Sequence, residues 1–217
     1  SITNYACERA VSIFNLSSVF EEEMKEKGVF KLFKEIEMPL SKVLAKMELE
    51  GISLDRNMLK RFSIELTKKL EIIVSKIYGF AGNEFNISSP KQMGEILFDK
   101  MQLSKKPKKT KSGQYATSEE ALLKLKSENP IINEILNFRA IKKILSTYVD
   151  TLPDLINKKT QRIHTTFNQS VASTGRLSSV NPNIQNIPIR TEIGMKVREA
   201  FIARNDDFTL MCADYSQ

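Results

Sequence analysis

The chain has 217 residues, 41% of them hydrophobic and 27% charged, which is ordinary for a globular protein with a real core. Its 33 Lys and Arg residues against 26 Asp and Glu give a formal charge of +7, which permits a polyanionic partner without requiring one. No signal segment or bilayer-long apolar run is present, and Cys7 and Cys212 match no metal or redox spacing, so we expect a cytoplasmic protein with reduced thiols and no membrane partner.

The first half of the chain has the apolar periodicity of helices. Residues 1–34 are predicted to be helical with a break at Gly28, and a second helix should end at Gly51. Asp55 is a plausible N-cap for a long amphipathic helix that we expect to stop at Gly79. The apolar stripe of this long helix is formed by Leu59, Phe62, Leu66, Leu70, Ile73 and Ile77.

Helix-start signals continue through the middle of the chain. Ser89 precedes Pro90 and Gln92 in a capping box, which predicts a helix to about Lys100. Residues 117–120 (TSEE) form a second capping box, and Pro130 follows the short helix that it opens. Residues 131 to about 152 then carry the apolar stripe of a long helix. A lysine-rich loop lies between these helices and contains Lys105, Lys106, Lys108, Lys109 and Lys111.

The pattern changes after Pro153. Residues 162–168 alternate apolar and polar side chains, as in a half-buried strand, and His164 within them has no Cys or His at metal-ligand spacing. Residues 191–203 should be a short helix that continues into an apolar segment. Residues 208–213 are nearly all apolar and predict a strand buried on both faces, with Asp214 at its end. A carboxylate there needs hydrogen bonds, a partner or a metal.

Polar side chains are concentrated between these apolar segments. Arg176 can donate a planar fork of hydrogen bonds to phosphates, sugars or base edges, although a surface arginine in a turn would look the same. Asn183, Gln185 and Asn186 each carry a donor and an acceptor, which suits base edges as well as ordinary turns. Taken together, these residues, the lysine loop and Asp214 point to nucleic acid and phosphoryl chemistry.

Four ordered stretches resemble family A DNA polymerases of the bacterial polymerase I type. They are residues 172–179 (ASTGRLSS), 181–188 (NPNIQNIP), 198–203 (REAFIA) and 213–217 (ADYSQ). Weaker similarity extends upstream through residues 36–40 (IEMPL), 85–89 (FNISS) and 146–148 (STY), so the resemblance covers the whole chain. The chain begins without Met and stops inside the last stretch, which indicates a fragment of a larger protein.

The resemblance implies an α+β multidomain fragment, mainly helical, with part of an antiparallel palm sheet. Residues 1–34 would be the end of a 3′–5′ exonuclease-like domain, and residues 35–54 the start of the polymerase domain. Residues 55–152 would form the helical thumb, and residues 153–217 a partial palm up to the catalytic aspartate.

The resemblance also assigns roles to individual residues. The lysine loop would contact phosphates of a primer–template duplex, and Arg176 would reach its minor groove beside Asn183, Gln185 and Asn186. Asp214 matches the aspartate that bridges two Mg²⁺ ions, with the backbone carbonyl of Tyr215 as a further ligand, while dNTPs are joined to the primer 3′-hydroxyl. The parent would act in DNA replication and repair at the bacterial nucleoid.

Departures from the family pattern limit what this chain is expected to do alone. The second metal-binding aspartate and the dNTP-gripping fingers helix are absent from its sequence, so we expect the isolated fragment to bind duplex DNA without polymerising. Arg9 stands where the exonuclease of the family has a metal-binding Asp, four residues after Tyr5, which predicts loss of proofreading. A non-catalytic nucleic-acid-binding module and a helical protein–protein adaptor remain alternatives.

Overall fold

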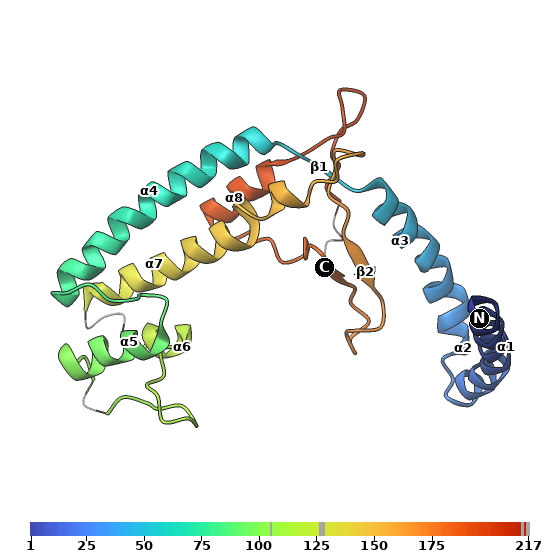
Figure 1. Cartoon of the computed structure of the whole chain (residues 1–217), viewed down its shortest axis with the longest axis horizontal. Helices are drawn as coiled ribbons and strands as arrows, with labels where there is room; N and C mark the ends of the chain where they lie inside the picture. Colours follow the sequence, from blue (N-terminus) through green and yellow to red (C-terminus); the bar gives the residue numbers. More distant parts are fainter. Residues whose placement is uncertain (105, 126–128, 214, 216–217) are drawn as a thin grey trace. The chain divides into compact units, whose positions relative to one another are not determined.

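The described part of the chain is mainly helical, with two small antiparallel sheets of two strands each (Figure 1). The computed structural model describes residues 1–104, 106–125, 129–213 and 215. They divide into two compact units, one of Ser1–Gly51 and His164–Gln185, the other of Ile52–Ile163 and the chain from Asn186 on. The expected combination of helices and a partial antiparallel sheet is confirmed, while the assignment of exonuclease, thumb and palm ranges stays a prediction.

The first unit joins a run of helices to a β-hairpin. Gly28 has a φ of +70°, which a side chain would disfavour, and it separates the first two helices as expected. Gly51 ends the third helix, also as expected. The elements of this unit are α1 (Ile2–Glu26), α2 (Phe30–Leu32), the π-helical η1 (Phe33–Glu37), α3 (Met38–Glu50), β2 (Thr166–Asn168) and β3 (Ser178–Val180).

Polar contacts hold the hairpin against α3. The Glu48 carboxylate accepts a hydrogen bond from the Phe167 amide at 2.6 Å, and the Glu48 carbonyl lies 2.7 Å from Nδ1 of His164. Farther along the hairpin, the side-chain amide of Gln169 donates to the Glu37 carboxylate at 2.6 Å. A backbone carbonyl is thus the partner of His164 Nδ1.

The second unit contains the hydrophobic core. Its longest helix, α4, begins after the Asp55 cap, whose carboxylate accepts from the Met58 amide at 2.8 Å. Every residue of the predicted α4 stripe is buried. The elements of this unit are β1 (Ser53–Leu54), α4 (Arg56–Ala81), α5 (Pro90–Gly94), η2 (Glu95–Lys100), α6 (Glu119–Leu123), α7 (Pro130–Ile144), η3 (Leu145–Val149), η4 (Leu152–Leu155), α8 (Glu192–Glu199) and β4 (Phe201–Ile202).

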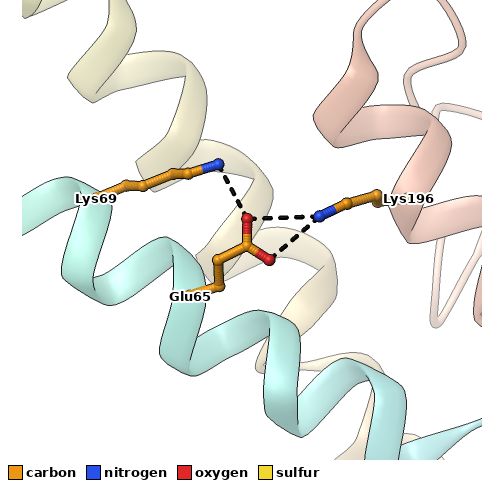
Figure 2. Close-up of polar contacts among 3 residues, drawn as sticks. All are labelled: Glu65, Lys69 and Lys196. Carbon is orange, nitrogen blue, oxygen red and sulfur yellow. Dashed lines mark hydrogen bonds and ion pairs between the residues drawn. The ribbon is translucent and has the colours of Figure 1, made fainter.

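Helices α4 and α7 lie side by side and supply most of this core, and α8 packs on α7 (Figure 1). An ion-pair group also links α8 to α4 (Figure 2). Lys69 Nζ lies 2.9 Å from Oε1 of Glu65, and Lys196 Nζ lies 3.2 Å from Oε2 of the same carboxylate. Hydrogen bonds from Lys69 and then Lys196 lower the pKa of Glu65 below its usual value.

Backbone pairing joins the two ends of the helical part of this unit. Ile52 and Ile163 exchange two backbone hydrogen bonds of 2.9 and 2.8 Å. Next to them, β1 pairs antiparallel with β4, with Ser53 opposite Ile202. The chain segment that carries α4 to α7 therefore starts and finishes at one place.

The sequence predicted that α4 would end at Gly79, but the helix continues past this residue. It continues to Ala81, which is buried, and ends where Gly82 adopts a φ of +70°. Glycine at position 79 is compatible with helix, and the buried contacts on both sides of it, Ile77 and Ala81, favour continuing the turn. The second capping box is also shifted by one residue, because Ser118 rather than Thr117 caps α6.

The strand expected at residues 208–213 is not formed. Phe208, Leu210 and Met211 are 50%, 56% and 87% exposed. An apolar run becomes a buried strand only where neighbouring strands pair with it and cover its faces, and no described strand does so here.

In the part of the chain that the structure describes, no helix combines the length and apolarity that a membrane span requires.

Candidate nucleic-acid interface

Arg176 lies on the connection between β2 and β3. These strands pair with Phe167 opposite Ser179, and the connection turns through Gly175, which has a φ of +75° and donates its amide to the Ala172 carbonyl at 3.1 Å. The Arg176 side chain is exposed. A short hairpin thus presents a guanidinium to solvent, where it can reach a ligand.

The asparagine-rich loop that follows β3 is organised around the buried side chain of Ser179. The backbone amide of Gln185 donates to Oγ of Ser179 at 3.3 Å and to Oδ1 of Asn183 at 3.1 Å. Oγ of Ser179 also lies 3.2 Å from Oδ1 of Asn183. The Asn183 oxygen is therefore occupied within the loop, which leaves the amino group of this side chain to meet a ligand, while the Gln185 side chain is exposed.

Thr165, which the sequence analysis did not single out, ties the same loop to the hairpin. Its buried hydroxyl lies 3.1 Å from the Val180 carbonyl and 2.7 Å from the Pro182 carbonyl. A Thr at a position where a half-buried strand faces inward has to place its hydroxyl on a polar partner, so the alternation of the strand was the available signal.

Asn186 begins the part of the loop that belongs to the second unit. Its side chain is exposed, and its backbone carbonyl accepts a hydrogen bond of 2.7 Å from the hydroxyl of Tyr148. Sequence reasoning placed Tyr148 in an apolar stripe and missed this contact. The signal was present, since a buried tyrosine hydroxyl usually has a hydrogen-bond partner.

The lysine-rich loop is an ordered turn and not an open loop. The Ala116 amide donates to the Lys108 carbonyl at 2.8 Å, and the Thr110 amide donates to the Gln114 carbonyl at 2.7 Å. Gly113, with a φ of +80°, completes the reversal. The exposed lysines of this turn are Lys106, Lys108, Lys109 and Lys111, and Lys105 lies outside the described residues.

Tyr115 fixes this lysine turn to the helices beneath it. Its hydroxyl donates to Asp99, which raises the pKa of Tyr115, and its ring centroid lies 5.0 Å from that of Phe98. A Cβ added to Gly94 of α5 would come within 2.8 Å of the Tyr115 Cβ, so the glycine permits a close approach. The Lys109 ammonium lies 5.1 Å from the centre of the Tyr115 ring. The lysines are thus presented on a fixed support.

The described residues do not form a metal site. No group of three or more His, Cys, Asp or Glu side chains within the described ranges could hold a metal ion. Asp214, the predicted shared ligand, lies outside those ranges, and Tyr215 is 99% exposed. The role of Asp214 and Tyr215 as metal ligands therefore stays a prediction.

The predicted site residues fall into two sets. Arg176, Asn183 and Gln185 belong to the first unit, and Asn186 and the lysine turn belong to the second. In the first unit, the Arg9 guanidinium of α1 lies 4.4 Å from the centre of the Tyr5 ring, and the expected loss of proofreading stays a prediction.

Comparison with known proteins gives a consistent result. The profile of DNA polymerase family A matches residues 56–217. DNA polymerase I of Synechocystis sp. is 50% identical over 93% of this chain and 20% of its own length, and that of Geobacillus stearothermophilus is 42% identical over 100% and 24%. The polymerase domain of Pol1 from M. smegmatis, solved in complex with DNA primer-template and dNTP, matches with a TM-score of 0.82 at 38% identity, over 89% of this chain and 34% of that one. The chain thus spans about a fifth to a quarter of these two curated relatives.

Proposed function

The chain belongs to DNA polymerase family A, and from this premise we propose that it forms the primer–template-binding part of a template-directed DNA polymerase. One observation carries the proposal: exposed cationic and amide side chains stand on loops whose backbones are held by internal hydrogen bonds. Such pre-ordered donors lose little conformational freedom on binding a polar ligand. The likeness to a polymerase domain solved with primer-template DNA supports the same ligand.

The lysine turn would contact the phosphate backbone. Lys106, Lys108, Lys109 and Lys111 are exposed, and the turn is fixed to α5 and η2 through Tyr115. Ammonium groups attract phosphates regardless of base sequence, which a polymerase needs because it must travel along any template.

The hairpin and the asparagine-rich loop would contact the minor groove near the primer end. Arg176 offers a forked donor, while Gln185 and Asn186 each offer a donor and an acceptor, and Asn183 offers its amino group. Both A·T and G·C pairs carry acceptors in the minor groove, so these donors can respond to correct pairing without reading the sequence.

The chemical step is assigned to the parent protein. There, Asp214 and the Tyr215 carbonyl would contribute ligands to two Mg²⁺ ions, which supply charge stabilisation for transfer of a nucleotide from dNTP to the primer 3′-hydroxyl. The described residues do not by themselves make such a site, so we assign no step to this chain. The parent would work in replication and repair on the bacterial chromosome in the cytoplasm.

Primer extension separates binding from catalysis. We expect the purified chain to bind a primer–template duplex and to leave the primer unextended with dNTPs and Mg²⁺ present. Extension by this chain at any Mg²⁺ concentration would contradict the proposed division between binding and chemistry.

Duplex titration at two salt concentrations tests the binding itself. We expect affinity to fall steeply with salt, and Lys108→Ala with Lys109→Ala to flatten the slope of log K against log salt by about one to two. The matched control is Lys158→Ala with Lys159→Ala, another adjacent exposed pair in the same unit. Equal slopes for both variants would show that the lysine turn is not a phosphate contact, and absence of duplex binding by the wild type would overturn the proposed function.

Arg176→Ala tests the minor-groove contact separately. We expect it to weaken duplex binding about 10-fold or more, the range of a lost charge-assisted hydrogen bond, without destabilising the fold, because the side chain is exposed. Unchanged affinity would remove Arg176 from the proposed interface.

A further inference from the structure

The chain on both sides of Ile187 is fixed by two elements of the second unit. On one side, Tyr148 of η3 is 5% exposed, and its hydroxyl donates to the Asn186 carbonyl at 2.7 Å. Tyr148 belongs to the continuous core that α4 and α7 build. The phenol therefore gives the Asn186 peptide a rigid point of attachment.

Burial also makes Tyr148 a dependable donor. It raises the pKa of Tyr148 above its usual value, because an ionised phenolate would lose solvation in the core. The hydroxyl therefore keeps its proton at neutral pH and can donate to the carbonyl throughout the working range of a DNA-binding protein.

On the other side, α8 touches the backbone of Pro188 directly. A Cβ built on Gly194 would lie 2.5 Å from the Pro188 carbonyl oxygen and 2.7 Å from its Cβ, closer than real side chains approach. Only a residue without a side chain allows this contact. Ile187 and Ile193 are partly buried against the same core, which closes the arrangement.

Asn186 itself contributes little to packing. Its side chain is exposed, while its backbone carbonyl is held at one end of the segment and Pro188 at the other. Because only two rotatable bonds separate the carboxamide from the backbone, the orientation of the peptide limits the positions that its donor and acceptor can reach.

We propose that Tyr148 is a positioning residue that acts through the Asn186 backbone to direct the Asn186 carboxamide at the bound duplex. The inference rests on the proposed function, because it takes primer–template DNA as the ligand of Asn186. It adds a residue that lies in the core, contacts no DNA and nevertheless sets affinity. Loss of one hydroxyl removes a single hydrogen bond while the ring of Tyr148 stays in the core, so Tyr148→Phe should change the orientation of the Asn186 peptide more than the stability of the fold.

A double-mutant cycle with Tyr148→Phe and Asn186→Ala tests the inference. We expect each single substitution to weaken primer–template binding about 3- to 10-fold, the effect of one net hydrogen bond. In the Asn186→Ala background, Tyr148→Phe should change affinity less than about 2-fold, because the side chain it directs is gone. A merely structural role would weaken binding equally in both backgrounds.

Tyr78→Phe is the matched control. Tyr78 also donates its hydroxyl to a backbone carbonyl, that of Phe85 at 3.0 Å, in the same unit but in another part of the core. We expect this variant to bind the duplex like wild type and to be additive with Asn186→Ala. Equal effects of the two Tyr→Phe substitutions would overturn the inference.

NMR supplies a measurement that needs no DNA. The side-chain amide resonances of Asn186 should shift in Tyr148→Phe and stay as in wild type in Tyr78→Phe, and unchanged resonances in Tyr148→Phe would overturn the positioning role. If wild type fails to bind duplex, the proposed function falls. If wild type binds but Tyr148→Phe and Asn186→Ala are additive, only the present inference falls.

Discussion

Helices α1 and α4 have nearly the same length, 25 and 26 residues, yet they are used very differently. Seven side chains of α4 are buried, from Leu59 to Ala81, whereas none of α1 is. Large apolar residues of α1 such as Ile13 and Phe14 are 69% and 76% exposed. The comparison teaches that periodicity identifies an apolar face, but only neighbouring elements turn that face into a core.

The largest expected difference comes from shortening a leucine in each helix. Leu66→Ala in α4 removes a fully buried side chain and should lower the free energy of unfolding by about 2–5 kcal/mol. Leu16→Ala in α1 shortens a side chain that is 46% exposed and should change it by less than about 0.5 kcal/mol. Urea denaturation followed by circular dichroism compares the two. Equal losses would mean that α1 shares the cooperative core.

A smaller difference is expected at the glycines that follow the two helices. Gly28 and Gly82 both have a φ of +70°, so alanine at either site is strained by about 1–2 kcal/mol. Neither site is crowded, since the nearest atom to an added Cβ is Lys100 Nζ at 3.7 Å, beside Gly82. We expect Gly82→Ala to lower the main unfolding midpoint, because α4 belongs to the core. Gly28→Ala should affect chiefly α1 and leave that midpoint nearly unchanged. If both variants lower the main unfolding midpoint equally, α1 unfolds together with the core that contains α4.

The smallest expected effect concerns two carboxylates with lowered pKa values. Glu65 of α4 owes its lowered pKa to Lys69 and Lys196, and Glu21 of α1 owes its own mainly to Lys25. A lowered folded-state pKa contributes stability above the unfolded value near 4.5, and this stability is lost as pH falls through the folded value.

Acid titration should therefore distinguish the two helices. Between pH 7 and pH values below 4.5, wild type should lose slightly more stability than Glu65→Gln, because the Glu65 carboxylate links α4 to α8 through Lys196 (Figure 2). Glu21→Gln should follow the wild-type curve more closely, since its ion pair stays within exposed α1. Coincident curves for wild type and Glu65→Gln would show that the α4–α8 pair adds no measurable stability.

Local signals in the sequence predicted local structure well. The Asp55 and Ser89 caps, the Gly28 and Gly51 breaks and the α4 stripe were all found, because each depends on residues within one or two helical turns. The end of α4 was misjudged, since Gly79 was read in isolation from the buried residues beyond it.

Features that depend on distant partners could not be predicted in the same way. The apolar run at residues 208–213 resembles a buried strand, but its state depends on pairing with other strands, and none of the described strands pairs with it. Likewise, the amide residues of the candidate site were identified by type, whereas the occupation of the Asn183 oxygen and the support of Asn186 by Tyr148 arise from contacts across the fold. Composition predicts the donors, and tertiary structure decides where they point.

The paired backbone bonds between Ile52 and Ile163 have an evolutionary and practical consequence. A segment whose two ends meet can be lengthened, shortened or exchanged at its far end without pulling its attachment points apart. The connections between α4 and α7 can therefore differ from one protein to another, while the Ile52–Ile163 junction and the packing of α7 on α8 stay in place.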